Sequence, residues 1–206
     1  MFGEWQTSAA EYARDVKRYE SEIGKLEWCA PQDWMCEPEM KLKTGLSTRE
    51  HQIRTVASVV ELRALGLPVI PVLQGWARGD YFDCWDLYER AGINLLREPV
   101  VGLGSVCRRQ SSLSISFLIN ELADEGLRLH GFGVKTQGLE FSQSRLVSAD
   151  SMAWSLAARR DTERGECGRK SCSSCFHAAV EWRQNMLSKL GASVLPARYN
   201  QQMSLF

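Results

Sequence analysis

Apolar and polar residues follow two different periods along the chain, which predict helices and strands in alternation. Apolar residues three or four apart predict amphipathic helices, and short unbroken apolar runs predict strands that are buried on both faces. The predicted helices span Ser8–Tyr19, Ser47–Ala64, Asp80–Ala91 and Ser112–Glu125. The predicted strands span Leu26–Ala30, Pro68–Leu73, Pro99–Leu103, Leu127–Phe132 and Leu146–Ala149. Strands that are separated by helices indicate an α/β fold with a parallel sheet.

Local signals fix the starts and the buried faces of two predicted helices. Ser8 is a suitable N-cap for the first helix. Ser47 is followed three residues later by Glu50, which is the spacing of a capping box, and Gly66 provides a stop. The apolar residues expected to face the core are Tyr12, Val16 and Tyr19 in the first helix and Ile53, Val56, Val60 and Leu65 in the second.

Small and polar residues follow each predicted strand directly. They are Gln32-Asp33, Gln74-Gly75, Gly104-Ser105, Gly133-Val-Lys135 and Asp150-Ser151. A (β/α) barrel and a doubly wound sheet both place the active site at the carboxyl ends of their strands. Five consecutive strand ends of this kind favour the barrel, because there they converge on one mouth.

Composition narrows the functional classes. The chain has 206 residues, 44% of them hydrophobic, which suits one globular domain with a sizeable core. Its 25 basic and 25 acidic side chains cancel, so no global field draws it to nucleic acid or membrane. Residues 1–50 hold seven basic and ten acidic side chains, whereas residues 157–206 hold eight and four. We therefore expect a polyanion to meet the protein near its basic end.

Targeting signals and cysteine usage indicate the compartment. The start of the chain lacks the apolar segment of a secretory signal, and no apolar run approaches the roughly 20 residues of a membrane span. We expect a cytoplasmic protein without a membrane partner. Seven cysteines, an odd number, indicate metal binding or free thiols rather than a disulfide framework.

Three polar residues at strand ends are candidates for chemistry, each with a structural alternative. Asp150 can act as a nucleophile or base, or it can cap the helix that follows. Asp33 can contact a ligand or serve as a turn residue. The amide of Gln74 can read the edge of a planar heterocycle, since it holds a donor and an acceptor, or it can satisfy loop backbone.

The glycine-rich segment 101–106 lacks the spacing of a dinucleotide or P-loop fingerprint. It indicates instead a close approach of backbone to a ligand. Arg108 and Arg109 follow it and can contact phosphate or remain solvated. We expect His130 to pack or to form hydrogen bonds at a strand end rather than to bind a metal.

Three cysteines lie within nine residues near the end of the chain: Cys167, Cys172 and Cys175. Thiolates at this spacing can converge on a tetrahedral Zn²⁺ ion without help from distant parts of the fold. His177 is the nearest candidate for a fourth ligand, and Cys84, Cys107 and the other histidines are further candidates. Because no open coordination position is evident, we expect a structural zinc.

Five short motifs occur in order along the chain. They are Ala-Pro-Gln-Asp33, Val-Leu-Gln74-Gly75, Val-Gly102-Leu-Gly104, Gly131-Phe-Gly133 and Ser-Ala-Asp150, and the cysteine cluster follows them. This set resembles the tRNA-guanine transglycosylase superfamily. The longer runs Pro-Gln-Asp-Trp-Met-Cys-Glu-Pro, His-Gly-Phe-Gly-Val-Lys-Thr and Ser-Ala-Asp-Ser-Met-Ala-Trp-Ser are most similar to its 7-deazaguanine DNA transglycosylase branch, deazapurine-containing DNA protein A.

The resemblance implies a fold and a reaction. Residues 1–160 would form part of a (β/α) TIM-type barrel, and residues 161–206 would form a zinc-binding segment with a C-terminal helix packed on it. The implied reaction exchanges guanine in DNA for a 7-deazaguanine base. Asp150 would attack the sugar and form a covalent glycosyl–aspartate intermediate. The implied base-binding residues are Asp33 and Gln74, together with the backbone of Gly102, Leu103 and Gly104.

The chain differs from the family pattern at two places. It lacks the early Asp-Ser-Gly-Gly/Ala-Phe motif, whose aspartate serves as general acid and base. We therefore expect a barrel without its N-terminal strand or strands, to be completed by upstream residues, a partner chain or a second copy. The tRNA-acting members place the nucleophile at the second aspartate of Gly-x-Asp-x-Phe-Asp-Cys, where this chain has Ala153.

Two alternatives to the DNA transglycosylase remain open. One is an enzyme that resembles tRNA-guanine transglycosylase and acts on tRNA. The other is a truncated, non-catalytic remnant that binds nucleic acid. In either case, the candidate phosphate-binding residues are Arg108, Arg109, Arg159 and Arg160.

Overall fold

The computed structural model describes residues 5–107, 109, 113–134, 138–139, 142–160 and 172–191. Its helices are α1 (Ala9–Ile23), α2 (Pro38–Thr44), α3 (Thr48–Ala64), α4 (Arg78–Arg90), α5 (Leu113–Asp124), α7 (Ala153–Arg160) and α8 (Phe176–Lys189). Its strands are β1 (Val72–Leu73), β2 (Val101–Leu103), β3 (Leu129–Gly131) and β4 (Leu146–Ala149). Two short 3-10 helices, η1 (Leu95–Arg97) and η2 (Gln143–Arg145), complete these elements.

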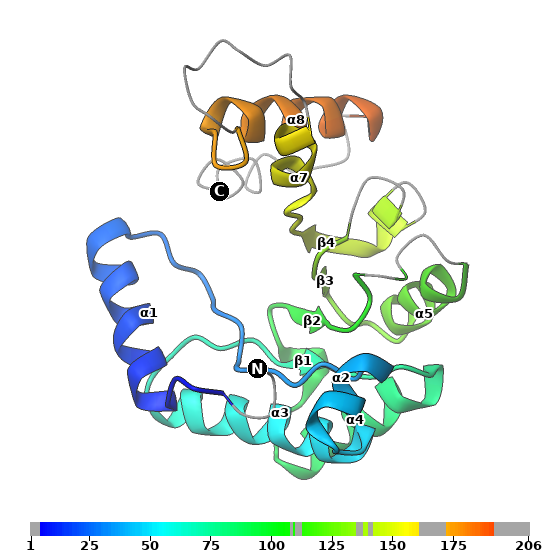
Figure 1. The fold of residues 1–206 in the computed structure, drawn as a ribbon. Helices are drawn as coiled ribbons and strands as arrows, with labels where there is room; N and C mark the ends of the chain where they lie inside the picture. The colour runs from blue at the N-terminus through cyan, green and yellow to red at the C-terminus, as the bar shows by residue number, and fades with distance from the viewer. Residues whose placement is uncertain are drawn as a thin grey trace.

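The four strands form one parallel sheet whose order is β1-β2-β3-β4 (Figure 1). This order follows the chain, as in a (β/α) barrel, and contains no reversal of the kind that defines a doubly wound sheet. The α/β class and the parallel sheet are therefore confirmed. The described strands form an open sheet, so a closed barrel is not confirmed.

The predicted strand at 26–30 is reduced to a single parallel bridge. Cys29 donates from its N–H to the carbonyl of Pro68 and accepts from the N–H of Ile70, which aligns it with Val69. The nearby residues Pro31, Pro68 and Pro71 lack an N–H, so they cannot donate to a longer ladder. The missing N–H groups of Pro68 and Pro71 also explain why β1 covers only two residues of the predicted strand at 68–73.

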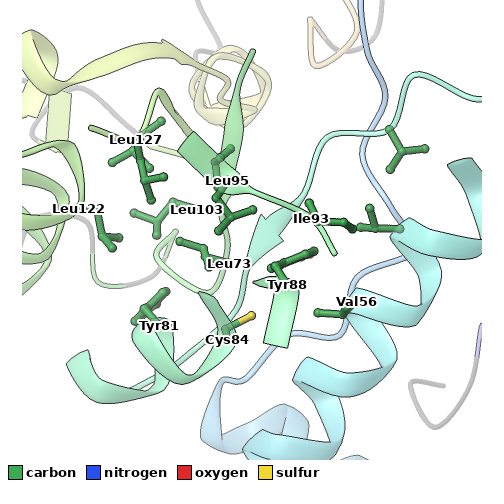
Figure 2. Packing of buried hydrophobic residues seen from close by; sticks show 14 of the residues in the cluster. Val56, Leu73, Tyr81, Cys84, Tyr88, Ile93, Leu95, Leu103, Leu122 and Leu127 are labelled. Atoms are coloured by element: carbon green, nitrogen blue, oxygen red, sulfur yellow. The ribbon is translucent and has the colours of Figure 1, made fainter. Parts of the chain in front are cut away.

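The core lies between the sheet and helices α3, α4 and α5 (Figures 1 and 2). Figure 2 shows Leu73 and Leu103 from the sheet beside Tyr81, Cys84 and Tyr88 from α4. The hydroxyl of Tyr88 donates to the carbonyl of Val72 at 3.0 Å and accepts from the N–H of Val72 at 2.9 Å. Helix α4 therefore satisfies the backbone of β1 as well as covering its side chains.

The predicted helix starts are confirmed for α1 and α3, where Ser8 and Ser47 form capping boxes with Glu11 and Glu50. Helix α4 begins at Arg78, two residues earlier than predicted. The reason is that the carboxylate of Asp80 accepts from the N–H groups of Trp76 and Ala77, both at 2.8 Å. An acceptor at this position satisfies backbone donors that a new helix leaves unpaired.

The predicted buried face of α3 is largely wrong. Val56 is buried, but Ile53 and Val60 are 48% and 46% exposed, and Leu65 is also exposed. Similarly, in α1, Val16 is buried while Tyr19 is exposed. The residues of α3 that fill the interior are His51, Gln52, Thr55, Val56, Val59 and Leu62.

Three of these interior residues are polar because they bind backbone groups of neighbouring loops. Gln52 donates to the carbonyls of Gln74 and Asp80 at 2.9 and 2.7 Å. The ring Nδ1 of His51 lies 2.6 Å from the carbonyl oxygen of Met35, and the Thr55 hydroxyl accepts from the N–H of Trp34. Since buried backbone groups require partners, these polar side chains take the place of apolar ones.

Helices α7 and α8 pack against each other beyond the carboxyl end of β4 (Figure 1). A small separate core joins them, formed by Ala158, Cys172, Cys175 and Ala178. The domain boundary predicted at residue 160 falls in the segment between these helices and stays a prediction. Within the described ranges, every helix is too short or too polar to span a membrane.

Candidate active site

The strand ends predicted to carry chemistry lie at one edge of the sheet. Gln74 follows β1, Gly104 follows β2, and Asp150 follows β4. Because the strands are parallel and adjacent, their carboxyl ends point the same way. The loop at 31–37 reaches the same edge, where it brings Asp33 to Gln74.

A chain of hydrogen bonds links three of these segments. The backbone N–H of Cys36 donates to the hydroxyl of Ser105 at 2.8 Å. That hydroxyl donates to the side-chain oxygen of Gln74 at 2.7 Å, and Gln74 Nε2 donates to the carboxylate of Asp33. Each hydrogen bond in this series is donated in the direction of Asp33. The side chain of Gln74 is fully buried, and both its amide oxygen and its amide nitrogen have partners. Gln74 therefore restricts the orientation of the Asp33 carboxylate.

The environment of Asp33 changes its acidity. Burial raises the pKa of the Asp33 carboxyl to about 6, although the hydrogen bond from Gln74 opposes this change. Burial disfavours the charged form because the protein interior solvates it less well than water. Asp33 therefore titrates close to the pH range in which proton transfers are useful.

Glycine is required beside this pair. A Cβ atom on Gly104 would overlap the side-chain amide of Gln74, and one on Gly102 would overlap the ring of Phe132. The N–H groups of Gly102 and Gly104 donate to the carbonyls of Pro71 and Leu73, at 2.8 and 3.0 Å. These two donors belong to the sheet, and Leu103 between them is a buried core residue. Gly104 therefore packs closely against Gln74, and Gly102 packs closely against Phe132.

Ser105 is one of the polar residues that follow the predicted strands, but the sequence does not predict it as a site residue. Its φ is 56°, a left-handed conformation that is uncommon for a residue other than glycine. This conformation turns the backbone directly after Gly104, where the Ser105 hydroxyl lies between Gln74 and Cys36. Strain of this kind persists where surrounding contacts hold it. No pattern in the sequence reveals that conformation.

Asp150 differs from Asp33 in its exposure. Its side chain is 55% exposed, and its Oδ1 accepts from the N–H of Gly133 at 2.9 Å and lies 3.4 Å from Nε2 of His130. Partial burial alone would raise the pKa of the Asp150 carboxyl, but the contacts with His130 and Gly133 lower it below its ordinary value. Asp150 is therefore an ionised carboxylate at neutral pH with one oxygen anchored, as a nucleophile requires.

The predicted phosphate-binding arginines differ in their surroundings. Arg108 lies outside the described residues. Arg109 donates to the carbonyl of Trp76 at 2.7 Å, and its guanidinium carbon lies 3.9 Å from the centroid of the Trp76 ring. Arg109 therefore secures the loop after β1. Arg159 and Arg160 are exposed in the last turn of α7.

The predicted zinc ligands are described only in part. Cys167 lies outside the described residues, whereas Cys172 and Cys175 are buried on one tight turn before α8. His177 is exposed in the first turn of α8. Over the portion of the chain described, no group of three or more His, Cys, Asp or Glu side chains is arranged to hold a metal ion. The pair Cys172 and Cys175 still fits two positions of a thiolate site, since both lie on one turn.

Comparison with known proteins identifies the family of the chain. No curated protein matches the chain. The family model described as DeoxyPurine in DNA protein A matches residues 1–203, which is nearly all of the chain. This is the branch that the motifs around Asp33, Gln74 and Asp150 resemble. The chain therefore belongs to the DeoxyPurine in DNA protein A (DpdA) family.

Proposed function

We propose that this protein exchanges guanine in DNA for a 7-deazaguanine base through a covalent glycosyl–aspartate intermediate. Membership of the DpdA family supports a DNA 7-deazaguanine transglycosylase-type function, with DNA as the substrate. The observation that carries the proposal is the pair of carboxylates at one edge of the sheet. Asp33 is partly buried and held by Gln74, while Asp150 is exposed and ionised.

The partly buried carboxylate of Asp33 suits recognition of a purine. Guanine carries two neighbouring donors, N1–H and the exocyclic N2–H, on its Watson–Crick edge. A carboxylate offers only acceptors and matches this pair, and Gln74 keeps the carboxylate of Asp33 in a fixed orientation. A 7-deazaguanine base retains the same edge, because the change from guanine lies in its five-membered ring. One pocket can therefore bind both the leaving and the entering base.

The exposed carboxylate suits the attack. In the proposed first step, Oδ2 of Asp150 forms a bond to C1′ of the nucleotide as the bond from C1′ to N9 of guanine breaks. Guanine leaves with the electron pair of that bond and takes up a proton from solvent. In the second step, N9 of the 7-deazaguanine base attacks C1′, loses its proton to solvent and displaces Asp150. Two substitutions replace one difficult exchange, as in retaining glycosidases.

The target nucleotide has to leave the base stack before this attack. Enzymes that act on a base cannot reach their target atom inside a stacked duplex, so the base is extruded or single-stranded. The exposed residues Arg159 and Arg160 at the end of α7 are candidates for contacts to the displaced phosphate backbone. The sequential strand order supports our further proposal that these strands are part of a (β/α) barrel.

We also propose that Cys167, Cys172 and Cys175 hold a structural zinc ion, with His177 as the fourth ligand. The burial of Cys172 and Cys175 on one turn supports this assignment. The same turn is tied to α7, because the hydroxyl of Ser155 donates to the carbonyl of Ser173 at 2.6 Å. A closed tetrahedral site stabilises a fold and takes no part in the reaction.

The test is incorporation of a labelled 7-deazaguanine base into DNA. Purified protein is incubated with the labelled base and with single-stranded DNA, duplex DNA or tRNA, both separately and in competition. The proposal predicts label in DNA and release of an equal amount of guanine. Label in tRNA alone would identify the tRNA-acting alternative. DNA binding that weakens steeply with salt, without exchange, would identify the non-catalytic alternative.

A further inference from the structure

His130 occupies the interior of the sheet beside Asp150, and the reaction proposed above gives it no role. The residue is buried, with its ring between two aromatic side chains. The ring centroid of Trp28 lies 5.0 Å away and that of Phe132 lies 4.6 Å away, both in edge-on orientation. These contacts restrict rotation of the imidazole, since aromatic pairs favour such T-shaped geometry.

An irregularity in the sheet brings two polar residues to this ring. Leu129 pairs with Leu146, but His130 pairs with Ser148, so β4 contains one extra residue at this point. A bulge of this kind redirects side chains and is often found beside functional sites. Paired residues of adjacent strands carry their side chains on one face, and so do residues two apart. Ser148 and Asp150 therefore both lie on the face that carries His130.

The two ring nitrogens have different partners. The distance from His130 Nδ1 to the hydroxyl oxygen of Ser148 is 2.8 Å, and the distance from Nε2 to Oδ1 of Asp150 is 3.4 Å. A carboxylate only accepts, so donation from Nε2 to Asp150 requires the hydrogen on Nε2. Nδ1 is the acceptor in that tautomer, and the hydroxyl of Ser148 lies where it can donate to it. The positions of Ser148 and Asp150 therefore favour the tautomer that presents an N–H to Asp150.

The contacts of Asp150 with Gly133 and His130 involve the same oxygen. Oδ1 accepts from Gly133 at 2.9 Å and faces His130. Within the described residues, Oδ2 has no protein hydrogen bond, and the carboxylate as a whole is more than half exposed. Fixing one oxygen limits the side-chain rotamers of Asp150 and leaves the other oxygen for the attack.

We propose that His130, in the tautomer selected by Ser148, is a positioning residue that fixes the carboxylate of Asp150 for attack on the sugar. This inference rests on the proposed function, because it assigns His130 a task in the same reaction. His130 acts through Asp150 and does not contact the sugar. Loss of such orientation is expected to lower turnover about 100-fold, the effect of misplacing a reacting group by about 1 Å. Affinity for the base should not change, since Asp33 recognises it.

The test compares two replacements of His130, each of which keeps a different property of the imidazole. His130→Gln retains an N–H donor at about the position of Nε2, whereas His130→Phe retains the ring for Trp28 and Phe132 but has no donor. We expect His130→Phe to lower kcat about 100-fold with KM for the base unchanged, and His130→Gln to stay within about tenfold of the wild type. Ser148→Ala should fall between them.

A purely structural role predicts the opposite order. Phenylalanine preserves the buried aromatic cluster better than glutamine, so His130→Phe would then be the more stable and more active variant. Melting temperatures of all variants are measured alongside the kinetics. Equal turnover of His130→Phe and wild type, or turnover of His130→Gln no higher than that of His130→Phe, would overturn the inference.

A measurement that needs no turnover separates this inference from the proposed function. Nitrogen-15 NMR of the imidazole at about pH 8 reports which ring nitrogen carries the hydrogen. We expect the Nε2–H form in the wild type and a mixture of tautomers in Ser148→Ala. The Nδ1–H form in the wild type would overturn the inference even if base exchange occurs. Absence of base exchange in the wild type would reject the proposed function whatever the tautomer.

Discussion

Gln74 donates a hydrogen bond from its side chain to Asp33, 41 residues earlier in the chain. The bond joins the end of β1 to the loop that follows the bridge at Cys29, and Ser105 after β2 holds the other end of the amide. Three segments that are distant in sequence therefore meet in one buried polar chain. This series of hydrogen bonds orients Asp33, whereas burial of the carboxyl raises its pKa against the effect of the Gln74 hydrogen bond.

The pKa of Asp33 predicts a pH-dependent stability. The pKa of about 6 in the folded protein lies above the ordinary value of 3.8, so the folded protein binds this proton more tightly than the unfolded chain. The free energy of unfolding should therefore fall as the pH rises from about 4 to about 6, and it should level off above that. Asp33→Asn lacks this titration, so its stability relative to wild type should rise by about 3 kcal/mol across the window.

Urea unfolding of both proteins at several pH values measures this difference. The comparison between proteins cancels the titration of the other groups. A difference that is constant from pH 4 to pH 8, or that shrinks as the pH rises, would show that Asp33 is not buried as described.

Gly104→Ala should disrupt the site while the matched Gly79→Ala does not. A Cβ on Gly104 would overlap the amide of Gln74, whereas a Cβ on Gly79 in α4 has open space around it. We expect Gly104→Ala to lose about 1–3 kcal/mol of stability through overpacking and to bind the base more weakly. Gly79→Ala should be neutral or more stable by up to about 1 kcal/mol, because alanine favours a helix. Melting temperature and KM for the base measure the two effects, and similar results for both variants would contradict the packing.

Helix α3 offers a test of its polar interior. Gln52 is buried and bonds two loop carbonyls, whereas its neighbour Ile53 is 48% exposed. Gln52→Leu should cost about 2–4 kcal/mol, since it removes the side-chain donor to the carbonyls of Gln74 and Asp80. Ile53→Gln should change stability by no more than about 0.5 kcal/mol. Chemical denaturation of the two variants measures these changes. If Ile53 rather than Gln52 faced the interior, as the hydrophobic spacing predicts, Ile53→Gln would be the more destabilised variant.

The sequence predicted the layout of the fold because its signals are local. Ser47 with Glu50 marks a helix start whatever surrounds it, and polar residues after strands mark one edge of any parallel sheet. The interior of α3 could not be predicted in the same way. His51, Gln52 and Thr55 are buried because loops from elsewhere place backbone groups against them.

Two features of the candidate site depend on backbone geometry that no residue type specifies. The left-handed conformation of Ser105 sets its hydroxyl against Gln74. The extra residue in β4 sets Ser148 beside His130. The strand-end pattern therefore predicted Asp33, Gln74 and Asp150 as candidates, but it could not predict the residues that orient them.

The zinc proposal predicts about one equivalent of zinc in protein purified without chelator. Cys172→Ser and Cys175→Ser should each lose most of the metal, because a serine hydroxyl does not replace a thiolate ligand. Cys107→Ser, a half-buried cysteine elsewhere in the chain, is the control and should retain it. Elemental analysis gives the metal content, and far-UV circular dichroism reports folding. Full zinc content in Cys172→Ser, or none in the wild type, would remove the zinc site from this account.

The most direct test of the account is to isolate the covalent intermediate. Wild-type protein is mixed with DNA in the absence of a free base, denatured, and analysed by gel electrophoresis and peptide mass spectrometry. We expect a protein–DNA adduct that maps to the peptide containing Asp150 and disappears when a 7-deazaguanine base is added. Asp150→Asn should form none, while the exposed control Asp86→Asn should match the wild type. An adduct at another residue, or undiminished base exchange by Asp150→Asn, would contradict the account.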